Sequence, residues 1–359
     1  MEEVFNWLIL RNVKGVGNKS LKKLYDFFNS SEEILSADIN TLSMIVGREK
    51  AARIKRKEGV SLGSIERLIK LTERWNIKII CIEDKDYPSQ LKIIEDPPPV
   101  IFSMGDIREG IYVGIVGSRF ATSYSLELTD QLCKALVEIG AYTVSGGAKG
   151  IDTKVHESTI KYGGYTLWIA GTGLLNLDIS LKEKILKAGS CIISEFDPFE
   201  KGSKYTFSQR NRLISGMAEI VVITEAGKKS GSLITAGYAL KQNKRVFVHI
   251  GMGRSERWEG CYRLLKEGKA EIFKDPSDIT EVIKPVDMKT ELAEEAILTD
   301  KESTATEEQI LALLEVPKTF DQLLIETGMK REELMGILSM LEIEGKVVKS
   351  GVYYMIYNI

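Results

Sequence analysis

The chain is poor in the residues that build metal sites and disulfide frameworks. Its 359 residues include two histidines and four cysteines, and no two cysteines form a CxxC pair. We therefore expect no metal centre and no disulfides, which fits a reducing cytoplasm. No apolar run approaches membrane-spanning length, and the acidic start is too short for a signal peptide. These absences predict a cytoplasmic protein that makes no contact with a membrane.

The overall charge does not identify a ligand. The formal net charge is −2, and a local basic surface can exist within a neutral total. A chain of this length can form two or three domains. The changes in sequence pattern predict a small helical domain at 1–72, an α/β domain at 73–284, an acidic linker at 285–305 and a winged helix at 306–359.

The helical segment 1–72 contains a candidate helix-hairpin-helix. Gly15-Val16-Gly17 precedes an amphipathic stretch in which apolar residues such as Leu21 and Phe28 repeat at helical spacing. In a helix-hairpin-helix, the tight turn and the helix N-terminus offer amide groups to one DNA phosphate. The same pattern also serves as a plain turn in small domains, so both interpretations stay open.

From about Lys78 the pattern changes to short β-branched runs separated by Gly-rich turns and amphipathic helices. Several runs are almost continuously apolar, as strands buried on both faces of a sheet are. Strands alternating with helices predict an extended Rossmann-like, mostly parallel sheet. The expected strands are 78–83, 112–118, 142–147, 165–171, 190–196, 219–226, 245–251 and 270–273.

The last segment has the order of elements of a winged helix. Helices are expected at 307–315, 319–328 and 330–345, followed by a hairpin that turns at Ser350-Gly351. The third helix stands in the place of a recognition helix and is largely acidic. This favours a protein partner, or contacts through Lys346 and Lys349 of the wing.

Two Gly-rich loops follow expected strands, where ligands bind in open parallel sheets. In the first loop, Gly117 permits a sharp turn, Ser118 offers a hydroxyl and Arg119 a forked cation. In the second, Gly146 and Gly147 belong to a backbone nest that can hold a phosphate. A plain strand-to-helix turn explains the first loop equally well.

Neither loop is a nucleotide-cofactor motif. The Walker Lys-Ser/Thr pair and the GxGxxG spacing are both missing, so we expect no cofactor. Asp152 is expected to cap the helix after the second loop, and His156 to be a packed or capping residue.

The segment 201–216 combines cations with aromatic rings. Single strands need this combination on a loop, because phosphates bind Lys and Arg while exposed bases stack on rings. We select Lys204, Phe207, Arg210 and Asn211 as candidate DNA contacts. Arg212 is expected to be structural, pairing with an acid such as Glu225. In a further loop, 224–240, small residues permit either phosphate approach or tight helix packing.

Taken together, these motifs resemble the DprA/Smf family (DNA-processing protein A). The resemblance implies a dimeric protein that binds and protects single-stranded DNA and loads RecA recombinase onto it during natural transformation and recombination, without catalysing a reaction. It also implies that Gly117, Ser118 and Arg119 contact phosphates, and that Lys204 and Phe207 contact the strand. The matching stretches are 115–122, 145–152, 194–198, 207–216, 224–236 and 259–273.

Two other interpretations remain open. Arg119 and Glu225 can stand for the Arg–Glu pair of a phosphoribohydrolase-like nucleotide enzyme, although the PGGxGT loop of that class is missing. A winged-helix transcription regulator with a ligand-sensing α/β domain is the other alternative.

Overall fold

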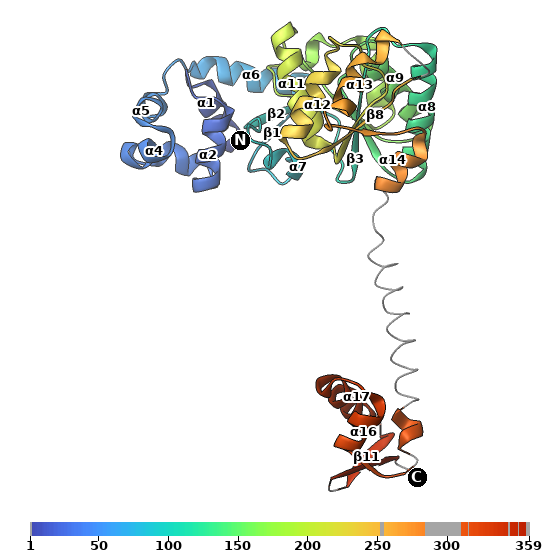
Figure 1. Cartoon of the computed structure of the whole chain (residues 1–359). Coiled ribbons are helices and arrows are strands. Elements are labelled where there is room, and N and C mark those ends of the chain that lie inside the picture. The colour runs from blue at the N-terminus through green and yellow to red at the C-terminus, as the bar shows by residue number, and fades with distance from the viewer. Residues whose placement is uncertain are drawn as a thin grey trace. The chain divides into compact units, whose positions relative to one another are not determined.

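The protein forms two compact units, residues Met1–Ile283 and Lys284–Ile359 (Figure 1). This computed structural model describes residues 2–251, 255–283, 310–314, 316–343, 345–350 and 352–356. The expected acidic linker at 285–305 and Gly351 of the expected wing turn lie outside the described residues. The boundary at residue 72 stays a prediction.

The N-terminal part is helical, as predicted, and contains a hairpin at Gly15. This glycine has φ +76° between the first two helices, where a side chain would be strained and would also strike Arg53. Ser30 and Asp38 cap two of the following helices through main-chain amides. The helices are α1 (Glu2–Asn12), α2 (Asn18–Phe28), α3 (Ser31–Ser36), α4 (Ile39–Val46), α5 (Arg48–Arg56) and α6 (Leu62–Arg74).

A nine-stranded sheet with the order β1-β2-β6-β5-β4-β3-β7-β8-β9 forms the centre of the first unit. Strands β3 to β9 are parallel, and β1 and β2 add antiparallel pairs at one edge, which confirms the mostly parallel Rossmann-like sheet. The strands are β1 (Lys78–Cys81), β2 (Val100–Met104), β3 (Tyr112–Val116), β4 (Tyr142–Ser145), β5 (Thr166–Ile169), β6 (Cys191–Ser194), β7 (Ile220–Ile223), β8 (Arg245–Val248) and β9 (Glu271–Ile272).

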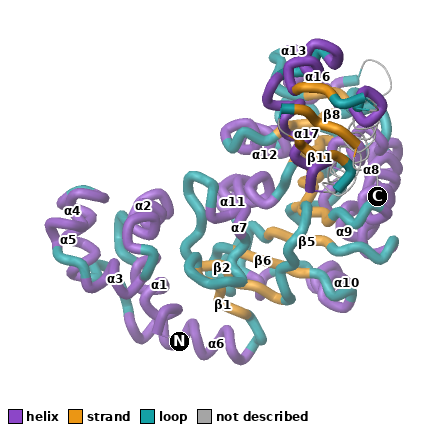
Figure 2. Tube along the Cα trace, turned by 90° about the horizontal axis from the view of Figure 1, so that it is seen from below, coloured by secondary structure: helices purple, strands orange, loops and turns teal. Residues whose placement is uncertain are grey.

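Helices cover both faces of this sheet (Figures 1 and 2). One face packs against α8 (Ser123–Glu138), α9 (Ile151–Lys161) and α14 (Pro276–Ile283). The other packs against α11 (Lys204–Met217), α12 (Ser232–Lys241) and α13 (Glu259–Lys266), with α1 and the other N-terminal helices continuing the same core. The other α-helices described in this unit are α7 (Ser89–Lys92) and α10 (Ile179–Lys187), and two short 3-10 helices are η1 (Leu174–Asn176) and η2 (Glu256–Trp258).

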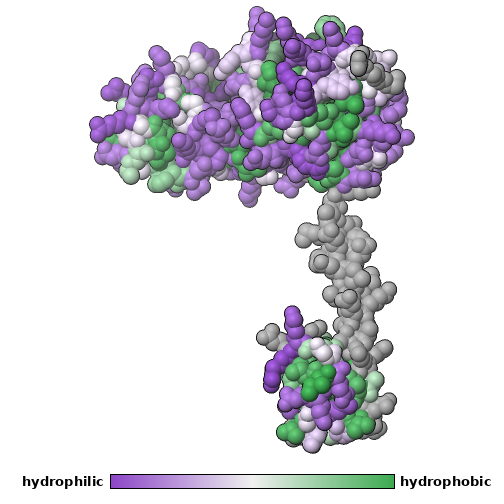
Figure 3. Space-filling view, viewed as in Figure 1, coloured by the Kyte–Doolittle hydropathy of each residue, from purple (hydrophilic) through white to green (hydrophobic). Residues whose placement is uncertain are grey.

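The strand order reverses beside β3, because the chain passes from β3 through β4 to β6 on one side and continues from β7 on the other. Ligands bind at such a switch point, beyond the carboxyl ends of the strands. Hydrophilic side chains cover most of the visible surface, and apolar ones gather in smaller patches (Figure 3). Among the described residues, no helix is both long and apolar enough to cross a membrane.

The second unit has the winged-helix arrangement predicted from its sequence. Residues 310–313 are helical, and α16 (Phe320–Thr327) begins with a capping box formed by Thr319 and Gln322. Helix α17 (Arg331–Ile343) follows, and the wing is a three-stranded sheet. Its strands are β10 (Lys318–Thr319), β11 (Val347–Ser350) and β12 (Tyr353–Ile356), in the order β10-β12-β11.

Candidate single-strand-binding site

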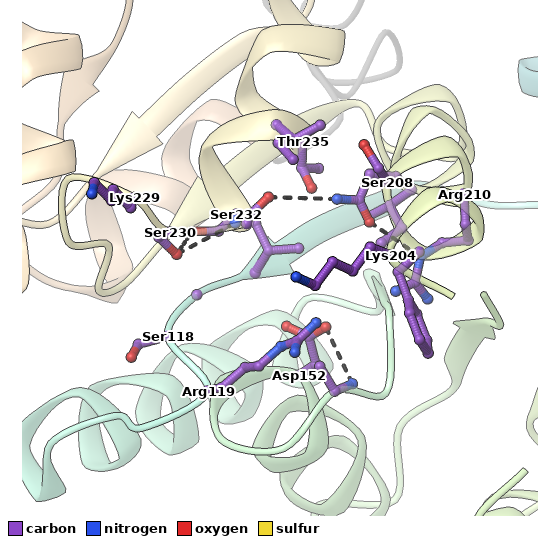
Figure 4. Close-up of a pocket in the computed structure, with 18 of the residues that line it drawn as sticks. Ser118, Arg119, Asp152, Lys204, Ser208, Arg210, Lys229, Ser230, Ser232 and Thr235 are labelled. Atoms are coloured by element: carbon purple, nitrogen blue, oxygen red, sulfur yellow. Dashed lines mark hydrogen bonds between the residues drawn. The ribbon is translucent and has the colours of Figure 1, made fainter. Parts of the chain in front are cut away.

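A cavity of about 750 Å³ lies at the switch point, beyond β3 and β7, and we call it the main pocket (Figure 4). A second cavity of about 440 Å³, the side pocket, adjoins it and shares Arg119 and Phe207 in its lining. Seven of the nine predicted residues line the main pocket, and Gly146 and Gly147 line the side pocket. The seven are Gly117, Ser118, Arg119, Lys204, Phe207, Arg210 and Asn211.

The first loop is held in shape by its own atoms and by a buried acid. The Oγ of Ser118 accepts a hydrogen bond from the amide of Phe120 at 3.2 Å. The carboxylate of Glu225 accepts from the amide of Thr122 at 2.9 Å and from its hydroxyl at 2.8 Å. Arg257 donates to the carbonyl of Phe120 at 2.7 Å. The loop is therefore fixed before any ligand arrives.

The second loop packs directly on the first. Gly150 has φ +83°, and a Cβ there would strike the carbonyl of Ser118. Gly147 has φ +71° and lies against the indole of Trp168. Both positions need glycine because their backbone is left-handed and because a neighbouring group leaves no room for a side chain. These reasons apply whether or not the loop also holds a phosphate.

Two polar residues of the helix after the second loop, Asp152 and His156, are both buried. Asp152 does not cap α9, because Gly150 is the cap and no side chain bonds there; its Oδ2 instead accepts from the amide of Ala148 at 3.4 Å. Burial raises the pKa of Asp152 to about 6, although Arg210 opposes the shift. His156 is packed, as predicted: its Nδ1 lies 2.7 Å from Thr166 Oγ1, and burial lowers its pKa to about 3.

The cation–aromatic segment is a helix from Lys204 onward, not the expected loop. Ser203 and Thr206 form a capping box that starts α11. Because side chains three or four positions apart share a helix face, Lys204, Phe207, Ser208 and Asn211 all line the main pocket. In Figure 4, Lys204 reaches into the cavity from α11, and Arg119 lies below it beside Asp152.

Arg210 lies in the floor of the pocket and is not an exposed phosphate ligand. It is buried, and its Nη1 donates to the carbonyl of Gly146 at 2.6 Å and to that of Ile169. Desolvation lowers its pKa to about 10. Its contacts join the ends of β4 and β5, so its geometry fits a positioning role better than the direct DNA contact we expected.

Arg212 is structural, as predicted, but its expected partner was wrong. Its guanidinium pairs with Glu195 at 2.7 Å and with Asp96 at 3.0 Å. Glu225 instead holds Thr122 and pairs with Arg257 at 3.5 Å. Because this carboxylate lies under the first loop and is absent from the linings of both pockets, the Arg–Glu pair of the enzyme interpretation is not assembled with Arg119.

The lining of the main pocket includes one ring and two cations that were not selected from the sequence: Phe120, Lys228 and Lys229. Phe120 is 85% exposed and belongs to both cavities, and Phe207, at 36%, supplies a second accessible ring. Lys228 and Lys229 enter from the loop after β7. The adjacent lysines after an expected strand were a readable signal, whereas the exposure of Phe120 was not visible in the sequence.

The main pocket is strongly cationic. Within the described part of the chain, no ion-pair partner or side-chain hydrogen bond engages Arg119, Lys204, Lys228 or Lys229. Asp152 is the one carboxylate among the described residues of the lining. The described residues also contain no cluster of three or more His, Cys, Asp or Glu that could hold a metal ion. The arrangement can therefore hold a polyanion alongside stacked rings.

Comparisons with known proteins identify the family and its domains. The family model of DNA recombination-mediator protein A matches residues 78–284, a SAM-like helix-hairpin-helix tandem matches 8–57, and the DprA winged helix domain matches 294–351. DNA processing protein DprA of Bacillus subtilis is 34% identical over 62% of this chain and 77% of its own length. Protein Smf of Synechocystis is 33% identical over 75% of this chain and 70% of its own length.

Two solved structures are similar as well. DNA processing protein A of Streptococcus pneumoniae superposes with a TM-score of 0.67 and 26% identity, covering 77% of this chain and 97% of that one. The Helicobacter pylori protein, whose structure was solved for its single-stranded DNA binding mode, gives 0.51 and 27% identity over 57% of this chain and 94% of its own. With a family model matching more than half of its residues, the chain belongs to the DprA/Smf family of DNA recombination-mediator proteins.

Proposed function

We propose that the protein binds and protects single-stranded DNA in the main pocket and hands the coated strand to RecA recombinase during natural transformation and recombination. The observation that supports this most is the set of four cations, unpaired within the described chain, around one cavity with two accessible rings. Phosphates bind such cations, and unpaired bases stack on such rings without sequence preference. The single-stranded DNA binding of the Helicobacter pylori relative supports the same ligand.

Each site residue receives a role in this proposal. Arg119 and Lys204 contact phosphates, and Phe207 stacks with a base. The Gly117–Ser118 and Gly146–Gly147 backbones let the strand approach closely, and Asn211 completes the wall on α11. Arg210 positions the site without touching the strand, because its guanidinium holds the carbonyl of Gly146 in the second loop.

A salt series with single- and double-stranded DNA of equal length tests the binding. We expect tighter binding to the single strand, with a log–log salt slope of about −0.7 for each phosphate neutralised. Equal affinity for the duplex, or binding that ignores salt, would overturn the proposal.

We further propose that the protein acts as a homodimer and consumes no nucleotide. The glycine loops lack the Lys-Ser/Thr pair that nucleotide hydrolysis needs. Purified protein should speed RecA assembly on strands covered by single-strand-binding protein while hydrolysing no ATP itself, and should sediment as a dimer. Nucleotide cleavage that disappears in Arg119→Ala or Glu225→Ala would favour the enzyme interpretation instead.

A further inference from the structure

A third cavity, of about 560 Å³, lies on the opposite side of α11 from the main pocket, and we call it the hairpin pocket. Its lining comes from the start of α2, from Lys50 of α5, from Tyr238 of α12 and from part of α11. The lining also includes one carboxylate, Asp96, which is ion-paired with Arg212 at 3.0 Å. It thus lies where the helix-hairpin-helix meets the Rossmann-like sheet within the first unit. The site described above does not use this pocket.

The first turn of α2 presents free donors to the hairpin pocket. Gly17 caps this helix without a side-chain hydrogen bond, and within the described chain the amides of Asn18 and Lys19 have no acceptor. The Nζ of Lys50 lies 2.7 Å from Ser20 Oγ, which places its ammonium beside the same turn. Amides at a helix N-terminus next to an ammonium group form an anion site.

Arg212 adds an independent indication of a ligand. Its side chain is only 1% exposed, it lines the hairpin pocket, and within the described chain its Nη1 has no hydrogen-bond partner. A buried guanidinium donor without a partner is costly unless something else accepts from it. Its ion pairs with Asp96 and Glu195 leave that donor unused.

The hairpin pocket and the main pocket adjoin the same helix, α11. Ser208 lines both cavities, with Lys204 and Phe207 on the main-pocket side. On the other side lies Tyr205, which is 74% exposed and available for stacking. A strand that leaves the main pocket over Ser208 would therefore meet a ring first and the donors of α2 next.

We propose that the hairpin pocket binds a second phosphate segment of the same DNA single strand, with Tyr205 stacking on a base between the two pockets. This rests on the proposed function, because the strand must first occupy the main pocket. The site lengthens the footprint of one subunit, so it contributes only when the strand is long enough to span α11.

Oligothymidylates from about 4 to about 16 nucleotides, a range of single-strand site sizes, test this on the full chain. Tyr205→Ala and Lys50→Ala should bind the longest strand roughly tenfold more weakly and the shortest strand like the parent. Phe27→Ala and Lys23→Ala are matched controls, because both residues are exposed on α2 and neither lines the pocket. These controls should bind every length like the parent.

The outcomes separate the two proposals. If the parent binds no single strand of any length, the proposed function fails. If the parent binds but both variants match it at every length, the hairpin pocket is not a DNA site and serves a protein partner or none. If both variants lose the same affinity for strands of every length, Tyr205 and Lys50 support binding in the main pocket and not in a second site. This result would also overturn the inference.

Discussion

At the residue scale, the cations of the first loop and of α11 fall into two groups, those that are free to bind a ligand and those that hold the fold. Arg119 and Lys204 have no partner in the described chain, whereas Arg210 and Arg212 are buried and engaged. The sequence assigned Arg212 to the second group, because a structural ion pair was expected for it, but it did not show that Arg210 is buried as well. Burial and partners depend on residues far away in the chain, such as Gly146 for Arg210.

Replacing Arg119 or Lys204 with Ala should weaken single-strand binding by about 1–3 kcal/mol, the value of a charge-assisted hydrogen bond. The salt slope should become shallower by about 0.7 for each phosphate that the variant no longer neutralises. Binding measured at several salt concentrations checks this. Lys134→Ala on α8, whose lysine pairs with Glu138, is the control. If both variants melt normally and bind like the parent, the site is misplaced.

Phe207→Ala should cost about 1–3 kcal/mol of binding through the loss of stacking, with no change in salt slope. Because the ring also packs over Gly171 and Gly202, Ala alone could destabilise the protein. Phe207→Leu keeps apolar contact without a π-face and should bind more weakly while melting like the parent. A Leu variant with full affinity would argue that Phe207 serves packing only.

Single-strand binding should strengthen as the pH falls from about 8 to about 5.5. The pKa of Asp152 is about 6 in the folded protein, so acid neutralises this carboxylate of the main pocket. The raised pKa also means that this group makes folding less favourable as pH rises from its unfolded pKa of 3.8 to about 6. Asp152→Asn should flatten the binding profile. An unchanged profile in that variant would remove Asp152 as the cause.

At the element scale, the first loop depends on Glu225. Glu225→Ala leaves the amide and the hydroxyl of Thr122 without their acceptor and should cost about 1–3 kcal/mol of unfolding free energy. Single-strand affinity should fall too, because Arg119 lies on that loop. Glu225→Gln retains an acceptor oxygen and should recover most of both losses. Urea titrations and binding assays measure this, and a fully stable Ala variant would contradict it.

Most elements were predictable, and the exceptions have physical reasons. Strands such as β3 and β7 are buried on both faces and are therefore apolar runs in the sequence. Strand β2 was missed, although Val100–Met104 is fully buried, since it follows a proline run that is typical of a loop. Helix α11 was taken for a loop because its cations and rings were interpreted by composition, without regard to the helical spacing of Lys204, Phe207 and Asn211.

At the scale of the whole molecule, every described residue that lines the three pockets belongs to the first unit. A protein ending at Ile283 should therefore keep its salt-dependent single-strand affinity, since the core of this unit is separate from that of the winged helix. Binding assays on the truncated and full chains check this. A large loss of affinity in a truncated protein that still melts cooperatively would show that the winged helix takes part in binding.

The direct packing of the two glycine-containing loops affects how fast single-stranded DNA can bind and leave. Because Gly150 lies against Ser118 and Glu225 accepts a hydrogen bond from Thr122 of the first loop, these two loops keep their shape without a bound strand. Association with a preformed cationic surface is governed by diffusion and electrostatic steering, and so depends on ionic strength. In the proposed function, two fixed loops that hold phosphates without reading bases can capture and release a strand at any point along its length, which fits the proposed transfer of DNA to another protein.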